Sequence, residues 1–402
     1  MRAKPLLFLV VVCLSLNACD GPEPVKIDRR PAPAPWSSRG PLAGVPSYDE
    51  SSSDPFQVDL RGYDLSALDL RGSLAALQQA DFDDRTVWPP AERMPAEFYW
   101  QRIMELGRNP GLGVRSLHEA GVKGQGIGIA IIDQPLLVEH QEYLDQLRLY
   151  EEIHVVAGAD AAMHGAAVAS IAVGETVGVA PDADLYYIGS WTGDFGVGNN
   201  DFTYNFAYYA QSVRRLIELN RQLPERRKVR VISMQVGWSP EQKGYEDITA
   251  AVDEARAAGM FVVSSSLEET SGFRFHGLGR DPMADPDAFE SYEPGPRWAE
   301  SFYAGQAGSD RLLVPMDART TASPGGPDEY VFYRQGGWSW AIPYIAGVYA
   351  LACQADPAVT PDRFWELALQ TGRTIQITHD GQAYSLGPIL DPVALIAALQ
   401  GK

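Results

Sequence analysis

The sequence predicts an α/β domain with three layers, in which helices cover both faces of a mostly parallel central sheet. Between residues 126 and 266, short apolar runs alternate with longer helical stretches, which is the pattern of successive β-α-β units. The apolar runs are continuous rather than alternating, as expected for parallel strands that are buried on both faces. Because functional side chains in such a sheet collect at the carboxyl ends of the strands, a site is expected there.

Strands and helices follow one another in this region. The apolar runs are short and bounded by polar residues or glycine, so we expect strands at 126–133, 183–191, 229–237 and 260–266. The stretches between them carry small residues or one apolar face, so we expect helices at 166–174, 205–223 and 245–259. A chain of 402 residues with 45% hydrophobic content can build one large core or two smaller ones.

The N-terminal residues are typical of an exported lipoprotein. Arg2 and Lys4 precede the short apolar run LLFLVVVCLSL, which is the layout of a secretory signal. The run ends in LNAC, which resembles the cleavage site of bacterial lipoproteins. We therefore expect a signal peptide at 1–18 and a lipid on Cys19, with plain cleavage or a retained anchor as alternatives. The protein would then lie outside the cytoplasm, anchored to a membrane that faces the periplasm or the cell surface.

A tether and a small repeat-like segment follow the signal. Residues 19–58 are rich in Pro, Ser, Gly and charge, so we expect a flexible tether there. In residues 59–98, apolar residues recur every five positions, at Leu60, Leu65 and Leu70, with Phe82 near the same phase. This spacing resembles pentapeptide repeats, but the run is too short to stand alone. We expect it to pack as a cap on the main domain of residues 99–402.

Charge and cysteine content exclude several classes of protein. The net charge is −19, from 33 Lys and Arg against 52 Asp and Glu, whereas a nucleic-acid-binding protein carries a basic face. Cys13 leaves with the signal and Cys19 would carry lipid, so Cys353 stands alone and no disulfide framework is expected.

Metal and cofactor motifs are also lacking in the sequence. No set of cysteines and histidines has the spacing of a zinc site, and no phosphate-binding glycine loop is found. The candidate calcium ligands are Asp281, Asp285 and Asp287, but their spacing is not that of an EF-hand loop. We expect no cofactor, with calcium as the one alternative.

Three polar residues lie at the ends of predicted elements. Asp133 closes the strand at 126–133, His164 opens a small-residue helix, and Ser339 precedes another. Taken singly, each has an ordinary structural use, as a turn or ion-pair residue, a structural histidine or a helix N-cap. Their order along the chain, Asp then His then Ser, is one of the known orders of a catalytic triad.

Longer motifs surround these residues. GVKGQGIGIAIID leads to Asp133, HGAAVASIAVG begins at His164, and GGWSWAIPYIAGVYAL holds Ser339 with Pro343 inside the helix, while VISMQVGW lies between them. Together they resemble the aspartate, histidine, serine and substrate-strand motifs of the subtilisin-like serine proteases, the subtilases, over about residues 100–398. The resemblance implies a subtilisin-like fold and a serine endopeptidase, here as a divergent bacterial lipoprotein member of the family.

The resemblance also implies a role for each residue. Ser339 would attack the peptide carbonyl after His164 takes its proton, and Asp133 would hold and stabilise the imidazolium. The unpaired N–H groups at the start of the Ser339 helix would face the oxyanion. The substrate would add as a strand along the backbone of Ser233, Met234, Gln235, Val236 and Gly237.

Several motif positions depart from the family's pattern. Gln134 and Pro135 follow the aspartate where a small polar residue and Gly are usual, and Ala166 stands in the place of a Thr. Trp338 and Trp340 flank the serine in place of Thr and Met. The tryptophans either line the cleft and narrow the choice of substrate, or simply pack.

The most consequential departure is Glu268, which by register occupies the place of the family's oxyanion asparagine. An ionised carboxylate donates no hydrogen bond, and the loss of such a donor costs about 10²–10³ in rate. Three interpretations are open. Glu268 is protonated and donates; a neighbouring hydroxyl of Ser265, Ser266 or Thr270 donates instead; or the oxyanion hole is impaired and hydrolysis is slow or absent.

Two hypotheses of different kinds follow. The first is an extracytoplasmic, lipid-anchored serine endopeptidase that acts on proteins or peptides as a monomer. The second is a pseudoprotease that binds peptides or partner proteins on the same scaffold. The complete triad favours the enzyme, whereas Glu268 and the altered motif flanks favour the binding module.

Overall fold

The computed structural model describes residues 26–33, 39–49, 52, 56–196, 202–306, 308 and 310–401. The expected signal peptide at 1–18 and Cys19 lie outside these residues. Within the described part of the chain, no helix is both long and apolar enough to cross a bilayer.

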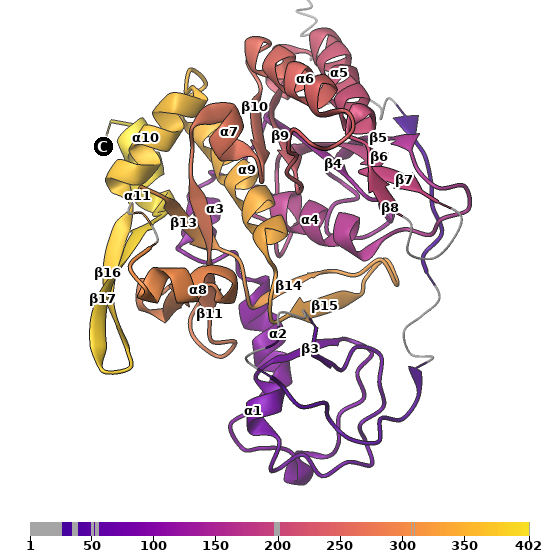
Figure 1. Cartoon of the computed structure of the whole chain (residues 1–402), viewed down its shortest axis with the longest axis vertical. Helices are drawn as coiled ribbons and strands as arrows, with labels where there is room; N and C mark the ends of the chain where they lie inside the picture. Colours follow the sequence, from indigo (N-terminus) through magenta and orange to yellow (C-terminus); the bar gives the residue numbers. More distant parts are fainter. Residues whose placement is uncertain are drawn as a thin grey trace, which may run out of the picture.

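A six-stranded parallel sheet forms the centre of the main domain (Figure 1). Its order is β1 (Lys26–Ile27), β5 (Leu147–His154), β6 (Asp184–Ser190), β4 (Gly128–Asp133), β9 (Val229–Met234) and β10 (Phe261–Ser264). Each neighbouring pair runs parallel. The predicted mostly parallel sheet is therefore confirmed, and its four predicted strands each overlap an observed one.

Helices cover both faces of this sheet. One face carries α5 (Ala207–Gln222) and α6 (Tyr245–Ala257), which lie side by side at the top of Figure 1. The other face carries α3 (Val114–Glu119), α4 (Met163–Val173), α9 (Trp338–Ala355), α10 (Pro361–Thr371) and α11 (Pro392–Leu399). The predicted three-layer arrangement is confirmed.

The packing of β4 explains why its sequence is apolar throughout. Ile129 and Ile131 belong to the core cluster of α4 and α9, whereas Ala130 and Ile132 belong to that of α5 and α6. All four residues have no exposed surface. Since both faces are buried, no position of the strand favours a polar side chain until Asp133 at its carboxyl end.

A second, five-stranded sheet and short helices complete the main domain. The order of this sheet is β12 (Tyr292–Pro294), β11 (Phe275–Arg280), β13 (Leu312–Pro315), β17 (Gln382–Ile389) and β16 (Arg373–His379). The short helices are α2 (Trp100–Arg108), α7 (Leu267–Ser271) and α8 (Pro296–Tyr303), and a small hairpin is formed by β7 (Gly193–Phe195) and β8 (Phe202–Tyr204).

The repeat-like segment of 59–98 forms stacked turns with one apolar interior. Its regular elements are β2 (Val58–Asp59), α1 (Leu74–Leu77) and β3 (Ala80–Asp83). The five-residue repeat places its apolar side chains inside, at 0–2% exposure, at Leu60, Leu65, Leu70 and Phe82. The segment is joined to the main domain because β3 pairs with β15 (Tyr330–Tyr333), which itself pairs with β14 (Arg319–Ala322). It therefore lies against the hairpin that precedes Ser339 in the chain.

The expected tether of 19–58 differs from the structure over part of its length. Lys26–Ile27 adds β1 to the open edge of β5, and Arg30 forms two hydrogen bonds with the Glu152 carboxylate, at 2.8 and 2.6 Å. Farther on, the N–H of Leu42 donates to the Asp64 carbonyl at 3.0 Å. These contacts use backbone and ionic groups, so the low apolar content of the segment did not reveal them.

Candidate active site

Asp133 and His164 form a hydrogen-bonded pair at the carboxyl edge of the central sheet. Asp133 is the last residue of β4, and His164 lies in the first turn of α4. The distance from His164 Nδ1 to Asp133 Oδ1 is 2.7 Å, and the side chains are 22% and 4% exposed. Because a carboxylate only accepts hydrogen bonds, Nδ1 carries the proton and Nε2 is left as the acceptor. This is the tautomer that a general base requires.

The close approach of α4 to the loop after β4 depends on a glycine. A Cβ at Gly165 would lie 2.5 Å from the Tyr187 hydroxyl oxygen and 2.7 Å from the Gln134 carbonyl oxygen. That hydroxyl donates to the same carbonyl at 2.6 Å. The glycine next to His164 therefore lets the imidazole lie against the end of β4.

The pKa of His164 is set by two opposing effects. Burial alone would lower it, but the charge of Asp133 and the hydrogen bond to it outweigh burial, and the pKa is raised above its ordinary value. Protonated imidazole is therefore stabilised by Asp133, as the proton-transfer step of acyl transfer needs.

Ser339 lies at the entrance of α9, in its first turn. Gly337 caps this helix with φ +66°, a backbone conformation that glycine adopts without strain. Ser339 is partly exposed, and the N–H groups of Trp338 and Ser339 have no backbone acceptor within the described residues. They are therefore available, at the positive end of the helix, to an oxyanion.

Aromatic contact links the serine helix to the histidine. The Trp340 ring lies 5.6 Å from the His164 ring and 5.5 Å from the Tyr333 ring, centroid to centroid. Trp340 is 3% exposed, so of the two expected roles it has the packing one. Trp338 is less buried and lies 5.8 Å from the His276 ring. No hydrogen bond joins Ser339 to His164 among the contacts of the described residues.

A buried acid that the sequence analysis missed supports the turn before Ser339. The Asp317 carboxylate accepts a hydrogen bond from the Gly336 N–H at 2.9 Å. Burial raises the pKa of Asp317 to about 6. No sequence signal marked this residue, because it lies far upstream of the serine motif and reaches it only through the fold.

Glu268 is exposed and paired with arginines rather than buried. It lies in α7, with 43% of its side chain exposed, 2.7 Å from Arg274 Nε and 3.8 Å from Arg311 Nη1. In these contacts the oxygens of Glu268 face guanidinium donors. The geometry therefore gives no support to the interpretation in which a protonated Glu268 donates to the oxyanion.

The neighbouring hydroxyls differ in their availability. Ser266 Oγ accepts from the Trp238 N–H at 3.0 Å, and Thr270 Oγ1 donates to the Ser266 carbonyl at 3.0 Å. The Ser265 hydroxyl has no hydrogen-bond partner among the described residues and is partly exposed. Of the alternative donors, Ser265 is the one left free.

Only part of the expected substrate strand, Ser233 to Gly237, lies beyond the central sheet. Ser233 and Met234 belong to β9, whose backbone is already paired with β4 on one side and β10 on the other. They cannot pair with an added strand, which corrects that expectation. Beyond the strand end, Gln235 and Val236 line a cavity of about 190 Å³ that also contains Asp133 and His164. Gly237 follows them, packed against the Ser265–Ser266 loop.

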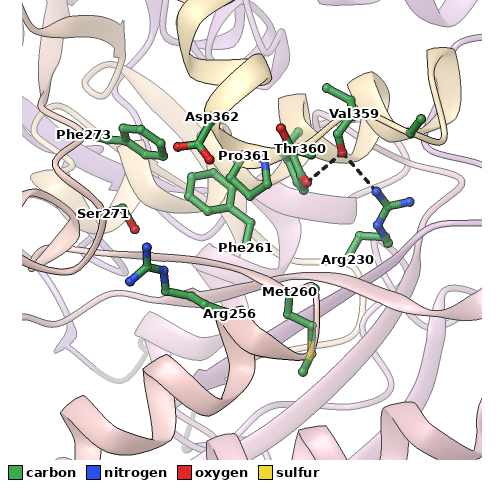
Figure 2. Close-up of a pocket in the computed structure, with 13 residues that line it drawn as sticks. Arg230, Arg256, Met260, Phe261, Ser271, Phe273, Val359, Thr360, Pro361 and Asp362 are labelled. Atoms are coloured by element: carbon green, nitrogen blue, oxygen red, sulfur yellow. Dashed lines mark hydrogen bonds between the residues drawn. The ribbon is translucent and has the colours of Figure 1, made fainter.

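A larger cavity lies at the amino-terminal ends of the strands, opposite the carboxyl ends where Asp133 lies. It has a volume of about 450 Å³ and is lined by the amino-terminal ends of β9, β10 and α10, with Arg230, Arg256 and Phe261 among its residues (Figure 2). None of the predicted site residues lines it. Arg230 donates to the Val359 carbonyl at 3.2 Å and is thereby used in packing. We place the functional site in the smaller cavity because the acid and the base meet there.

The aspartates considered for calcium serve as loop acceptors. Asp281 accepts from the Met283 N–H at 2.8 Å, Asp285 from the Asp287 N–H at 3.0 Å, and Asp287 from the Gly113 N–H at 2.9 Å. The described part of the chain contains no group of three or more side chains arranged to hold a metal ion.

Part of this chain matches a known protein family. The model of the subtilase family matches residues 124–291. This part of the chain is similar to the subtilases. The matched part of this subtilase-like chain includes Asp133, His164 and Glu268 and ends before Ser339. The match supports a serine protease, in the hydrolase class. A solved structure, that of the prenylagaramide maturation protease PagA, is similar with a TM-score of 0.47 and 16% identity, covering 72% of this chain and 99% of that one.

Proposed function

We propose that this protein is a serine endopeptidase that acts outside the cytoplasm through Asp133, His164 and Ser339. The observation that supports the proposal most is the 2.7 Å hydrogen bond from His164 Nδ1 to Asp133 Oδ1, which sets the tautomer of a general base. The second support is the position of Ser339 in the first turn of a helix whose Trp340 ring contacts the His164 ring.

The proposed reaction uses each group for one task. His164 Nε2 takes the proton of the Ser339 hydroxyl as its oxygen attacks the peptide carbonyl, and the Asp133 carboxylate stabilises the imidazolium that forms. The free N–H groups at the start of α9, with the Ser265 hydroxyl beside Glu268, stabilise the oxyanion. His164 then returns the proton to the leaving amine, and water hydrolyses the acyl-enzyme by the same steps.

The proposal is tested by labelling the protein from residue 20 onward with a fluorophosphonate probe between pH 4 and 9. We expect labelling that is lost in Ser339→Ala and retained in Ser385→Ala, an exposed serine on the β17 strand. Labelling that persists in Ser339→Ala would disprove Ser339 as the nucleophile. A folded wild-type protein that is not labelled at any pH would disprove the enzyme proposal.

The second candidate function is peptide binding without hydrolysis, and one observation favours it. Glu268, paired with Arg274 and Arg311, presents a carboxylate where the family has an amide donor. If its charge repels the oxyanion strongly enough, the cleft would bind peptides without cleaving them. Binding of a peptide pool with no cleavage and no labelling would select this alternative.

Attachment to a membrane through Cys19 is a proposal drawn from the sequence. Since Lys26 lies in the central sheet, only six residues separate it from Cys19, and an extended chain spans at most about 3.6 Å per residue. A lipid on Cys19 would therefore hold the domain close to the bilayer rather than on a long tether. The full-length protein should fractionate with membranes, and Cys19→Ala should release it; membrane association that survives Cys19→Ala would disprove the lipid anchor.

A further inference from the structure

An arginine covers the glycine that caps the serine helix. A Cβ placed on Gly337 would lie 3.5 Å from each of Cζ, Nε and Nη2 of Arg297. Because the three distances are equal, the flat face of the guanidinium is turned toward this glycine. Ser339 follows two residues later, so the cation lies beside the entrance of α9.

Among the residues that the structure describes, none forms an ion pair with Arg297. It is exposed, no ion pair or hydrogen bond holds its guanidinium within the described residues, and the buried Asp317 interacts with it only through charge. Arg274 and Arg311 are paired with Glu268. Arg334, which also acts on Asp317 through its charge, donates to the Gln78 carbonyl at 3.1 Å. In a chain with 52 acidic and 33 basic side chains, Arg297 is thus a cation beside the site whose charge is not neutralised by contact.

The position of Arg297 is set by the residues on either side of it. Pro296 begins α8, and Trp298 is buried, with its indole Nε1 donating to the Gly277 carbonyl at 2.6 Å. The His276 ring stacks on the Trp298 ring at 4.5 Å and lies 5.8 Å from the Trp338 ring, next to Ser339. This aromatic stack ties α8 to the start of α9. The backbone that carries Arg297 is therefore fixed next to Gly337, at the start of α9.

We propose that Arg297 binds an acidic side chain of the substrate close to the scissile bond, so that the preferred substrates are peptides with Asp or Glu there. The inference rests on the proposed function, in which Ser339 is the nucleophile. A guanidinium offers two parallel N–H groups to a carboxylate, which neither an amide nor a hydroxyl of a substrate can match. Since Arg297 is exposed, the expected preference is moderate, about two- to fivefold in kcat/KM for Asp over Asn.

The test compares matched peptides that differ by a single Asp or Asn, placed in turn at each position within three residues of the cleaved bond. We expect one position at which wild type prefers Asp about two- to fivefold, and loss of that preference in Arg297→Gln. Arg297→Glu should reverse it, favouring Lys over Gln at the same position. The matched control is Arg363→Gln, an exposed arginine paired with Glu366 on α10, which should keep the wild-type preference. Added salt should weaken the preference in wild type, because exposed charges are screened.

Two results would overturn the inference. One is the absence of any Asp-over-Asn preference in wild type; the other is a preference that persists unchanged in Arg297→Gln. Both leave the proposed nucleophile intact if the fluorophosphonate still labels Ser339. Failure of that labelling in the folded protein would instead refute the proposed function, so the two failures are distinguishable.

Discussion

The Asp133–His164 contact allows a prediction that separates the charge of the carboxylate from its role as a hydrogen-bond acceptor. The same oxygen, Asp133 Oδ1, accepts from His164 Nδ1 at 2.7 Å and from the Gln134 N–H at 2.7 Å. In Asp133→Asn, the amide can keep this geometry, but it can also turn its NH₂ toward His164 Nδ1. Nδ1 then accepts, the proton moves to Nε2, and the general base is lost. In Asp133→Ala, both N–H groups lose their acceptor.

The expected losses follow from the strengths of these bonds. A hydrogen bond to a charged group contributes about 1.5–3 kcal/mol, against about 0.5–1.5 kcal/mol for a neutral one. Loss of the charge alone would cost this difference, about 1–1.5 kcal/mol, or about tenfold in rate. Because Asp133→Asn also loses the tautomer, it should be slower by about 10⁴, and Asp133→Ala by a similar factor.

The assay is the rate constant of fluorophosphonate labelling at pH 8, with thermal unfolding measured to show that each variant is folded. Asp182→Asn, which changes an exposed aspartate just before the start of β6, is the matched control and should label at the wild-type rate. A loss of only about tenfold in Asp133→Asn would refute the reasoning, since it would mean that the imidazole keeps its tautomer and loses only the stabilising charge. No loss in either variant would show that Asp133 does not act on His164.

Three further predictions follow from the same geometry. Since the pKa of His164 is raised by Asp133, labelling of Ser339 should rise with pH through a midpoint above 6.5. The stabilisation that protonated His164 gives the fold should be lost over the same pH range. A labelling midpoint below 6.5 would contradict this prediction. Glu268→Gln removes a carboxylate and supplies an amide donor, so kcat should increase. The increase should reach about 10²-fold if the carboxylate impairs the oxyanion hole. An unchanged kcat would show that Glu268 lies too far from the oxyanion to affect it. Gly165→Ala places a methyl group 2.5 Å from the Tyr187 hydroxyl. It should lower the free energy of unfolding by about 1–3 kcal/mol, as measured by denaturant unfolding. An unchanged unfolding midpoint would show that α4 can move away from the loop that follows β4.

Much of the architecture was predictable because burial acts directly on residue type. β4, β6, β9 and β10 lie between two helical layers, so their sequences are apolar through almost their whole length. The predicted end of the strand at Asp133 is correct because a carboxylate at the end of a buried strand is visible in sequence. The end of β9 was placed too late, because residue type does not mark where strand pairing stops: Gln235 and Val236 follow the strand in sequence but leave the sheet.

Contacts that depend on backbone groups or on distant chain segments were not predictable. The strand at Lys26–Ile27 is held by the open edge of β5, which no side-chain pattern records. The ion pairs of Glu268 come from Arg274 and Arg311, and their effect depends on exposure, which the register of a motif does not specify.

The sequence by itself determined the three-layer α/β class and which residues are candidates for acid, base and nucleophile, because periodic burial and motif spacing are local properties of the chain. Only the tertiary structure decided that His164 meets Asp133 with the tautomer of a general base, that Glu268 faces two arginines, and that Arg297 lies over Gly337. These depend on distances between side chains that are far apart in the chain, and such distances are set when the layers pack.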